Sequence, residues 1–377
     1  MSLVRVWAIT RKEFISIFRD ARSVYLGIAI PVILLLLFAY ALTMDVDQVP
    51  ILVWDQSRSP DGRELISRFA DSRYFQVQRY AENYQDIEQA IDRNEALAGL
   101  IIPRNFSQRL KARQPAPVQW IADGSDSNTA FIATGYATAV AQIYSEEIQL
   151  REIRQISGRT LSAPLDFRPR VWFNEDLESR NYIIPGLIAV IMMVIAALLT
   201  SLTIAREWEN GTMEQLISTP VKGFELILGK LIPYFLIAMF DVLVAVLMAR
   251  YQFQVPLRGS VSLILGTGAV FLVGALSLGL LLSILTKNQL LANHIALLTT
   301  FIPTFLLSGF AFPITSMPPV IQWLTFLVPA RYLVSLYKGI FMKGVGLEAL
   351  YLEAGLLALF AVVMILLALV KFKKKLV

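Results

Sequence analysis

The sequence contains no cysteine and a single histidine among its 377 residues. The lack of cysteine excludes disulfide bonds, thiolate metal sites and cysteine nucleophiles. With His294 as the one histidine, the chain lacks the material for a metal site built on several histidines and for ordinary Ser-His-Asp catalysis. We therefore expect no catalytic residue, no metal site and no cofactor site in this chain.

A glycine-rich phosphate loop is also missing. Such a loop ends in glycine, lysine and then serine or threonine, at a fixed spacing from an earlier glycine. The nearest segment runs from Gly223 to Gly229-Lys230-Leu231. Its glycine spacing is one residue too long, and Leu231 cannot coordinate magnesium. Any ATP hydrolysis that drives this protein must therefore take place in another chain.

Apolar residues, in contrast, are abundant and segregated. They make up 56% of the chain, against 17% charged residues, which is more than soluble globular domains contain. Six runs approach or exceed the roughly 20 residues that cross a 30 Å hydrocarbon core. We therefore predict an α-helical polytopic membrane protein with six spans, at residues 24–43, 181–205, 224–249, 261–285, 290–311 and 347–370.

Basic residues beside the spans set the predicted orientation, because cytoplasmic flanks carry an excess of lysine and arginine. Five arginines and lysines precede the first span, and four lysines lie in the tail 371–377. Both termini are therefore expected to be cytoplasmic. Three basic residues run against this pattern, since Arg331, Lys338 and Lys343 lie in a loop that six spans place outside.

The N-terminal segment 1–23 is predicted to contain an amphipathic helix over Leu3–Asp20. Its apolar residues, among them Val6, Trp7 and Phe14, lie near one helical face, which is typical of a helix in the membrane interface. A basic topogenic flank is the alternative interpretation. The tripeptide Ala39-Tyr40-Ala41 resembles a signal-peptidase site, but the span-length run before it indicates an uncleaved first span.

Residues 44–180 are long enough for an independent domain, which the orientation places outside the cytoplasm. Alternating short strands and helices predict an inserted α/β domain. The predicted strands are Val49–Trp54, Phe75–Tyr80, Ala98–Ile102 and Val118–Ala122, and the predicted short helices are Gly62–Ala70 and Gln85–Ala96.

A longer helix is predicted over Ser127–Ser157, and Gly158 is placed to end it. Its apolar stripe comprises Ile132, Tyr136, Ala139, Ile143, Leu150 and Ile153. Because amphipathic helices usually serve their own core, we expect this stripe to pack on the sheet of the same domain. Contact with another subunit is the alternative.

Asp241 is the most informative isolated charge, because it lies inside an apolar run and an ionisable residue in a membrane is costly. We expect it to face a protein interior or an aqueous path, where it becomes a candidate for the transport path. Pairing with Arg250 or with a polar neighbour on another span is the structural alternative. Glu353, near the outer end of the last span, is explained by snorkelling.

The loop at residues 206–223, between the second and third spans, is predicted to hold a short helix. Thr212 is the expected N-cap, with Gln215 completing a capping box, and Glu214 in the first turn complements the helix dipole. Pro220 disfavours helix at Thr219. The apolar face of this helix, formed by Met213, Leu216 and Ile217, is expected to enter a protein groove.

This loop resembles the signature of ABC-2-type exporter permeases. The segment REWENGTMEQLISTPVKGFELILGKLIPY, residues 206–234, follows the family pattern E-x-E-x-G-T-x-E-Q-L-x-x-T-P before a third span. Three further stretches agree with the family: RKEFISIFRDAR before the first span, NYIIPGLIAVIMM in the second, and LLSGFAFPITSMPPVIQWLTFLVPARYLV between the fifth and sixth. The domain after the first span is similar to that of the branch with a large periplasmic insertion.

The resemblance implies a bacterial inner-membrane exporter of type V architecture, built from two permeases and two cytoplasmic ATPase subunits that bind ATP and magnesium. It implies that residues 1–23 are a connecting helix and that residues 312–346 form re-entrant helices near the exit. Some members use a periplasmic adaptor. The implied coupling residues are Glu207, Glu209, Gly211, Thr212, Met213, Glu214, Gln215 and Leu216, and the exit prolines are Pro313, Pro318, Pro319 and Pro329.

Two other functions remain open at this point. An ion-coupled secondary transporter would use Asp241 as its ion site, although the sequence shows no internal repeat. A membrane sensor would bind a ligand in residues 44–180, although no cytoplasmic signalling domain is evident. Co-purification of an ATPase subunit would separate these three functions. An amphiphilic or drug-like substrate is expected from the family, and the sequence does not specify it further.

Overall fold

The computed structural model describes residues 2–20, 25–42, 48–157, 172–174 and 178–372. The chain divides into two compact units. A helical unit comprises Met1–Met44 and Val171–Val377, and an α/β unit comprises Asp45–Arg170. The α/β unit therefore falls within the predicted domain 44–180.

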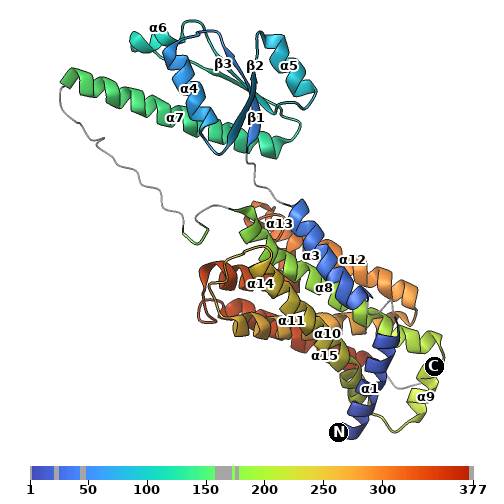
Figure 1. Ribbon diagram of the computed structural model, residues 1–377. Coiled ribbons are helices and arrows are strands. Elements are labelled where there is room, and N and C mark those ends of the chain that lie inside the picture. Colours follow the sequence, from blue (N-terminus) through green and yellow to red (C-terminus); the bar gives the residue numbers. More distant parts are fainter. Residues whose placement is uncertain (1, 21–24, 43–47, 158–171, 175–177, 373–377) are drawn as a thin grey trace. The chain divides into compact units, whose positions relative to one another are not determined.

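The α/β unit is built on a sheet of four strands in the order β2-β1-β3-β4 (Figure 1). The strands are β1 (Val49–Asp55), β2 (Phe75–Tyr80), β3 (Ala98–Ile102) and β4 (Gln119–Ala122). Strand β1 pairs in parallel with β2 and β3, whereas β4 runs antiparallel to β3. All four strands occur where the sequence predicts them, and β2 and β3 have the predicted bounds.

Helices cover both faces of this sheet. Helix α4 (Pro60–Ala70) and the long α7 (Ser127–Ser157) pack on one face, and α5 (Tyr84–Asp92) packs on the other. Helix α4 begins where the Ser59 hydroxyl accepts a hydrogen bond from the N–H of Gly62 at 3.0 Å, which satisfies an otherwise unpaired donor. The short α6 (Phe106–Lys111) was not predicted, because six residues are too few for a helical period.

The predicted face of α7 is confirmed only in part. The helix packs on its own sheet as expected, through Ala133, Ala137 and Tyr144 together with Tyr136 of the predicted stripe, while Ile143 of that stripe is 57% exposed. Small alanines let the helix approach the sheet closely, which a count of large apolar residues does not reveal. The Tyr144 hydroxyl donates to the carbonyl of Asp61 at 3.0 Å, and burial raises its pKa to about 12. Ile153 lies outside the described side chains.

The helical unit contains five helices that are long and apolar enough to cross a membrane, among the described residues. They are α8 (Ser179–Glu209), α10 (Gly223–Tyr251), α11 (Val261–Thr286), α12 (Gln289–Leu307) and α15 (Tyr351–Lys371). Each coincides with a predicted span. At the predicted first span, the π-helix η1 (Tyr25–Ala29) and α3 (Ile30–Ala41) form a shorter apolar helix. The count of six spans therefore stays a prediction.

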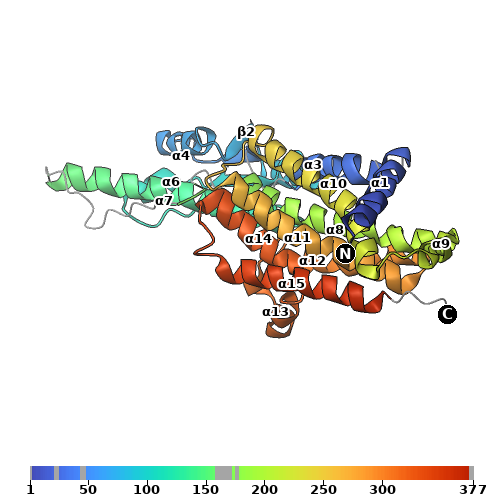
Figure 2. The ribbon, with the colours of Figure 1, turned by 90° about the horizontal axis from the view of Figure 1, so that it is seen from below.

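Helix α8 occupies the centre of the helical unit (Figures 1 and 2). It contacts α3, α10, α11, α12 and α14 (Pro329–Lys338), and 94% of its most apolar stretch is buried. Close packing against α11 relies on small residues, as is usual where membrane helices meet. A Cβ at Gly279 would lie 2.3 Å from the carbonyl oxygen of Ala197. The position therefore requires glycine.

The predicted re-entrant region is a pair of helices bent by 86°. It comprises α13 (Pro319–Thr325) and α14, with the π-helix η3 (Gly339–Lys343) continuing α14. Prolines mark these boundaries: Pro313 precedes the 3-10 turn η2 (Ile314–Ser316), Pro318 and Pro319 start α13, and Pro329 starts α14. A break in a helix is tolerated within a membrane only where the backbone is buried in protein or lines water, and α14 is buried through Leu333, Leu336 and Tyr337.

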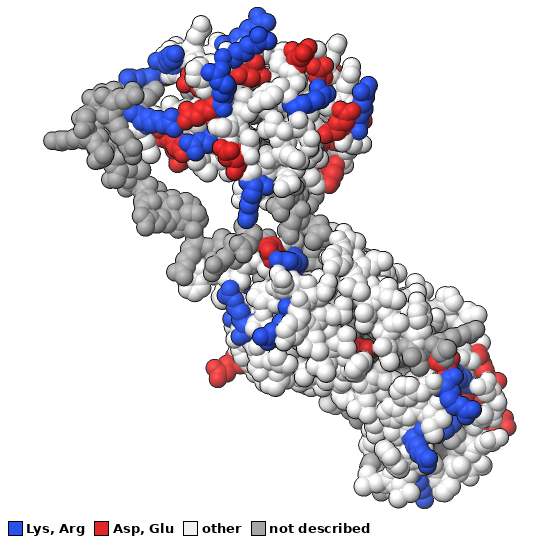
Figure 3. Space-filling view, viewed as in Figure 1, with Lys and Arg blue, Asp and Glu red and all other residues white. Residues whose placement is uncertain are grey.

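Charged residues of the helical unit gather at its two ends. Figure 3 shows blue and red side chains at both ends in this view and a largely uncharged surface between them. One end carries α1 (Leu3–Arg19), α9 (Thr212–Ser218) and the end of α15 (Figures 1 and 2). This distribution is the one expected of a protein that crosses a bilayer.

Candidate functional site

The loop after α8 holds the predicted short helix, which the structure confirms as α9. The chain turns between α8 and α9 at Gly211, whose φ of 68° lies in the left-handed region that glycine adopts without strain. Gly211 is the N-cap of α9, so the prediction that Thr212 caps the helix is wrong. Thr212 is the first helical residue, and the predicted capping box with Gln215 does not form.

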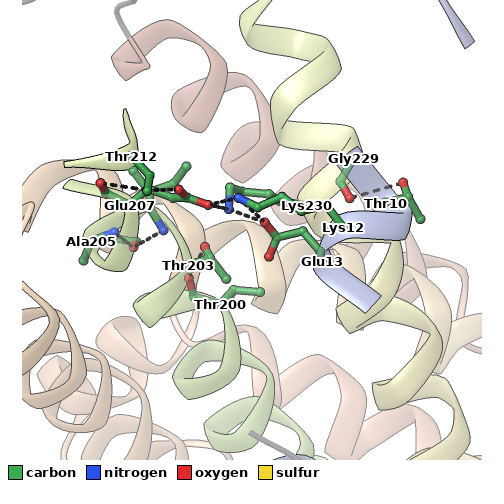
Figure 4. A network of polar contacts seen from close by, with 12 residues as sticks. Thr10, Lys12, Glu13, Thr200, Thr203, Ala205, Glu207, Thr212, Gly229 and Lys230 are labelled. Atoms are coloured by element: carbon green, nitrogen blue, oxygen red, sulfur yellow. Dashed lines mark hydrogen bonds and ion pairs between the residues drawn. The ribbon is translucent and has the colours of Figure 1, made fainter. Parts of the chain in front are cut away.

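The Thr212 hydroxyl instead connects α9 to α8. It donates to the side-chain carboxylate of Glu207 and lies 3.3 Å from the Glu207 carbonyl oxygen. Figure 4 shows Thr212 and Glu207 at one end of a line of polar contacts. Glu207 is itself buried, with 7% of its surface exposed. Glu207, which the family resemblance implies is a coupling residue, therefore makes these contacts within its own chain.

Lys230 of α10 is the centre of this network. Its Nζ lies 2.7 Å from Oε1 of Glu13 on α1 and 3.2 Å from Oε1 of Glu207 on α8 (Figure 4). Lys12, which is half exposed, contacts the same Glu207 oxygen at 2.6 Å. Two lysines thus balance two glutamates. Lys230, Glu13 and Glu207 are almost completely buried, and buried charges are tolerated only when they are paired in this way.

Helix α1 confirms the predicted amphipathic helix but has two apolar faces. One face packs against α10 through Val6, Ile9 and Ile17, where a Cβ at Gly229 would lie 2.7 Å from Ile9. The Thr10 hydroxyl donates to the carbonyl of Gly229 at 3.2 Å. The second face points outward and is also apolar, with Leu3, Trp7 and Phe18 each more than 60% exposed. This face is suited to the membrane interface.

The start of α10 is fixed to α1 by further contacts. The Glu225 carboxylate accepts hydrogen bonds from the N–H of Ser2 at 2.7 Å and from the N–H of Lys222 at 3.0 Å. Arg5 donates to the carbonyl of Pro220 at 2.5 Å, so it reaches the segment that follows α9. The start of α1 is thus bonded both to α10 and to the segment that follows α9.

The residues of α9 divide into inward and outward sets. Met213 is 1% exposed and belongs to the core of the helical unit, so it is not available to a partner in this structure, contrary to expectation. Leu216 and Ile217 pack partly against the same core. Glu214 and Gln215 are exposed. Together with the exposed Ser218 at the end of the helix, they are the side chains of α9 that can meet another protein.

Glu209 links the end of α8 to the start of α12. Its carboxylate accepts hydrogen bonds from the backbone N–H of Gln289 at 2.8 Å and from the Gln289 side-chain amide. Sequence reasoning placed Glu207 and Glu209 in one interface, but it had no means of seeing Lys230 or Gln289 as their partners. A lysine inside an apolar run is the signal that could have drawn attention to Lys230.

Asp241 lies apart from this network, inside α10. Its side chain is 2% exposed, and neither carboxylate oxygen has a hydrogen-bond partner among the described residues. It lines a cavity of about 10 Å³ with Pro31 of α3 and Ile188 of α8. Arg250, the alternative partner, instead places its guanidinium 5.7 Å from the ring centre of Tyr251. The expectation that Asp241 faces the protein interior is met in this structure.

The long apolar helices and the charged network at one end define a polytopic α-helical membrane protein. Residues 22–370 match the family described as ABC-2 family transporter protein. The chain therefore belongs to the ABC-2 family, as the resemblance of its membrane segments to that family predicted.

Relatives agree with this assignment. The chain is 36% identical to the probable multidrug ABC transporter permease YbhS of Escherichia coli K12, over 91% of this chain and 90% of that protein. It is 30% identical to the probable multidrug ABC transporter permease YbhR of the same organism, over 92% of each. The inner membrane transport permease YhhJ is 25% identical over 86% of this chain and 85% of that protein. The protein is a transmembrane permease subunit of an ABC transporter.

Proposed function

We propose that this permease is driven by a separate ATPase subunit that contacts the outward side of α9. The observation that carries the proposal is the network in which Thr212 holds Glu207, and Glu207 holds Lys230. Through it, α9 is tied to α8, α10 and α1, while Glu214 and Gln215 face outward. A displacement of α9 would thus be transmitted to α8, α10 and α1 together.

Motion can pass along this path because the buried pairs resist separation. Separating Lys230 from both Glu13 and Glu207 would leave its buried charge uncompensated, which costs about 3–5 kcal/mol. Helices α1, α8 and α10 therefore move as one body when α9 is displaced. A permease responds to its ATPase only through interactions that differ between the open and closed ATPase states, and the exposed carboxylate of Glu214 is placed to make them.

We infer the topology from the charge pattern. Both termini and the 206–223 loop are cytoplasmic, residues 44–180 are extracytoplasmic, and the bent pair α13/α14 lies in the outer half of a bacterial inner membrane. In this orientation the exported substrate leaves past the prolines of residues 312–346. The relatives named as multidrug permeases support an amphiphilic or drug-like substrate.

The proposed assembly contains two permeases, identical or different, and two ATPase subunits that bind ATP and magnesium. A periplasmic adaptor is an additional proposed partner, and α7 offers it an outward face that includes Phe131 and Ile143. An ion-coupled secondary transporter and a membrane sensor are not favoured, because membership of the ABC-2 family supports an ATP-driven permease.

The coupling proposal predicts that Glu214→Lys leaves the permease folded but weakens its binding of the ATPase subunit. Reversing one interface charge costs about 2 kcal/mol or more, so binding of the ATPase should fall by more than about tenfold. The measurements are co-purification of the ATPase subunit and substrate-stimulated ATP hydrolysis in proteoliposomes. The matched control is Glu348→Lys, the same reversal at an exposed glutamate outside α9. Wild-type ATPase retention and stimulation in Glu214→Lys would contradict the proposal.

We also propose that Asp241 belongs to the transport path. Keeping an ionisable residue at this depth costs about 3 kcal/mol, which a structural role without partners does not explain. Asp241→Asn is expected to lower export about tenfold or more at an unchanged protein level, measured with a fluorescent substrate in inverted vesicles. Met248→Leu, which changes an uncharged residue of the same cavity, is the control. Full export by Asp241→Asn would remove this residue from the mechanism.

A further inference from the structure

A cavity of about 350 Å³ lies beside the bent helix pair. It is bounded by the start of α8, the segment after α12, α14 and the start of α15, all within the helical unit. Its volume falls in the roughly 300–1,000 Å³ range of small-molecule sites. Apolar side chains, among them Ile314, Phe326 and Leu356, form much of its wall, and two cations, Arg331 and Lys338, line it as well.

Lys338 is positioned in this cavity by neutral groups. Its Nζ donates to the carbonyl of Gly309 at 2.9 Å and lies 3.3 Å from the ring centre of Tyr182. The Tyr182 hydroxyl donates to the same carbonyl at 3.2 Å. The aliphatic part of Lys338 passes Gly186, where a Cβ would lie 3.5 Å from its Cε. These contacts orient the ammonium group and leave its charge unbalanced.

Arg331 is held in the same manner, two helical turns before Lys338 on α14. It donates to the Thr325 hydroxyl and to the carbonyl of Gln322 at 3.4 Å, and its Cζ lies 3.8 Å from the ring centre of Phe326. Among the described residues, no carboxylate lies within ion-pair distance of Arg331 or Lys338. Glu353 lines the cavity without pairing with either cation.

Two unbalanced cations in one cavity require an explanation. They lie in the loop that breaks the charge pattern of the membrane flanks, where basic residues are disfavoured outside the cytoplasm. Desolvating a cation without a counter-charge is costly. A ligand that supplies the negative charge would offset this cost, and the surrounding apolar wall indicates that the ligand is also apolar in part.

We propose that this cavity binds the phosphate-bearing headgroup of a membrane phospholipid. Arg331 and Lys338 would contact the phosphate oxygens, for which guanidinium and ammonium groups are the usual protein donors. The acyl chains would lie along the apolar wall near Leu352 and Leu356. The carboxylate of Glu353 would accept a hydrogen bond from the ammonium group of a zwitterionic headgroup. The leaflet in which the lipid sits rests on the proposed topology, but the site does not depend on coupling to an ATPase.

The test uses the full-length permease purified alone, so that it is independent of ATPase binding. The protein is delipidated and titrated with short-chain phosphatidylethanolamine, short-chain phosphatidylglycerol or inorganic phosphate, and bound species are counted by native mass spectrometry. The variants are Arg331→Gln, Lys338→Gln and their double. Lys343→Gln, an exposed cation of the same loop outside the cavity, is the control.

Each cation removed should weaken phospholipid binding about tenfold, as expected for a charge-assisted contact. Arg331→Lys and Lys338→Arg, which keep the charge, should bind lipid and show that the site tolerates substitution. Binding of lipid but not of inorganic phosphate supports the proposal. Equal binding of phosphate and lipid overturns the lipid assignment and leaves an anion site. Wild-type lipid binding by the double glutamine variant overturns the site altogether.

Discussion

Replacing Lys230 with methionine is expected to destabilise the permease by about 3–5 kcal/mol, the cost of leaving one side of a buried ion pair uncompensated. Glu13 would lose its 2.7 Å contact, and the half-exposed Lys12 would be left to serve both glutamates, at 2.6 Å from Glu207 and 3.9 Å from Glu13. Helix α1 should then separate from α10. The measurements are the melting temperature of the purified permease in detergent and protease cleavage within α1, which should become faster.

The matched control is Lys222→Met, because Lys222 is an exposed lysine at the start of the same helix. It should melt like the wild type. Glu13→Gln combined with Lys230→Met should recover part of the loss, because it removes the buried charge that the single variant leaves behind. An unchanged melting temperature in Lys230→Met would mean that the network contributes nothing to the docking of α1.

Gly279→Leu is expected to prevent α11 from packing against α8. A Cβ at this position would lie 2.3 Å from the Ala197 carbonyl oxygen and equally close to the Thr200 hydroxyl. That hydroxyl donates to the carbonyl of Leu276 at 2.8 Å, a hydrogen bond between the two helices. Overpacking and the lost interhelical bond together should cost about 2–4 kcal/mol. Folded protein after membrane extraction, measured by size-exclusion fluorescence, should fall sharply.

Gly266→Leu is the control for this variant. Gly266 lies on the same helix, and a Cβ there would meet nothing within 4 Å. It makes the same chemical change at an open position and should leave the yield of folded protein unaffected. Equal yields of the two leucine variants would contradict the tight α8/α11 contact.

Local patterns predicted the α/β unit closely. Strand β3 has the predicted bounds because Ala98–Ile102 is a short, fully buried apolar run, and α7 has the predicted bounds because its helical pattern is long. The predicted face of α7 was right at Tyr136 but wrong at Ile143, because Ala133 and Ala137 determine how near the helix can lie to the sheet. Residue size, rather than hydrophobicity alone, decides which face is buried.

The candidate site was predictable only in part. Its location followed from the motif, and α9 formed where expected, but Gly211 took the capping position because it alone among these residues adopts a positive φ without strain. The network was not predictable, because Lys230 contacts a glutamate 217 residues away in sequence. Contacts at such separation depend on how whole helices pack, which no local pattern contains.

That separation also sets an order of events during synthesis. Glu13 is synthesised 217 residues before Lys230, its partner in the folded protein. At about 5–20 residues per second, this interval lasts roughly 10–40 s. During this interval α1 lacks its packing partner α10, and Glu13 lacks Lys230. The outward apolar face of α1, formed by Leu3, Trp7 and Phe18, can bind the bilayer surface in the meantime. Although α1 is the first helix made, its docking at this end of the helical unit therefore has to wait until α10 has been synthesised.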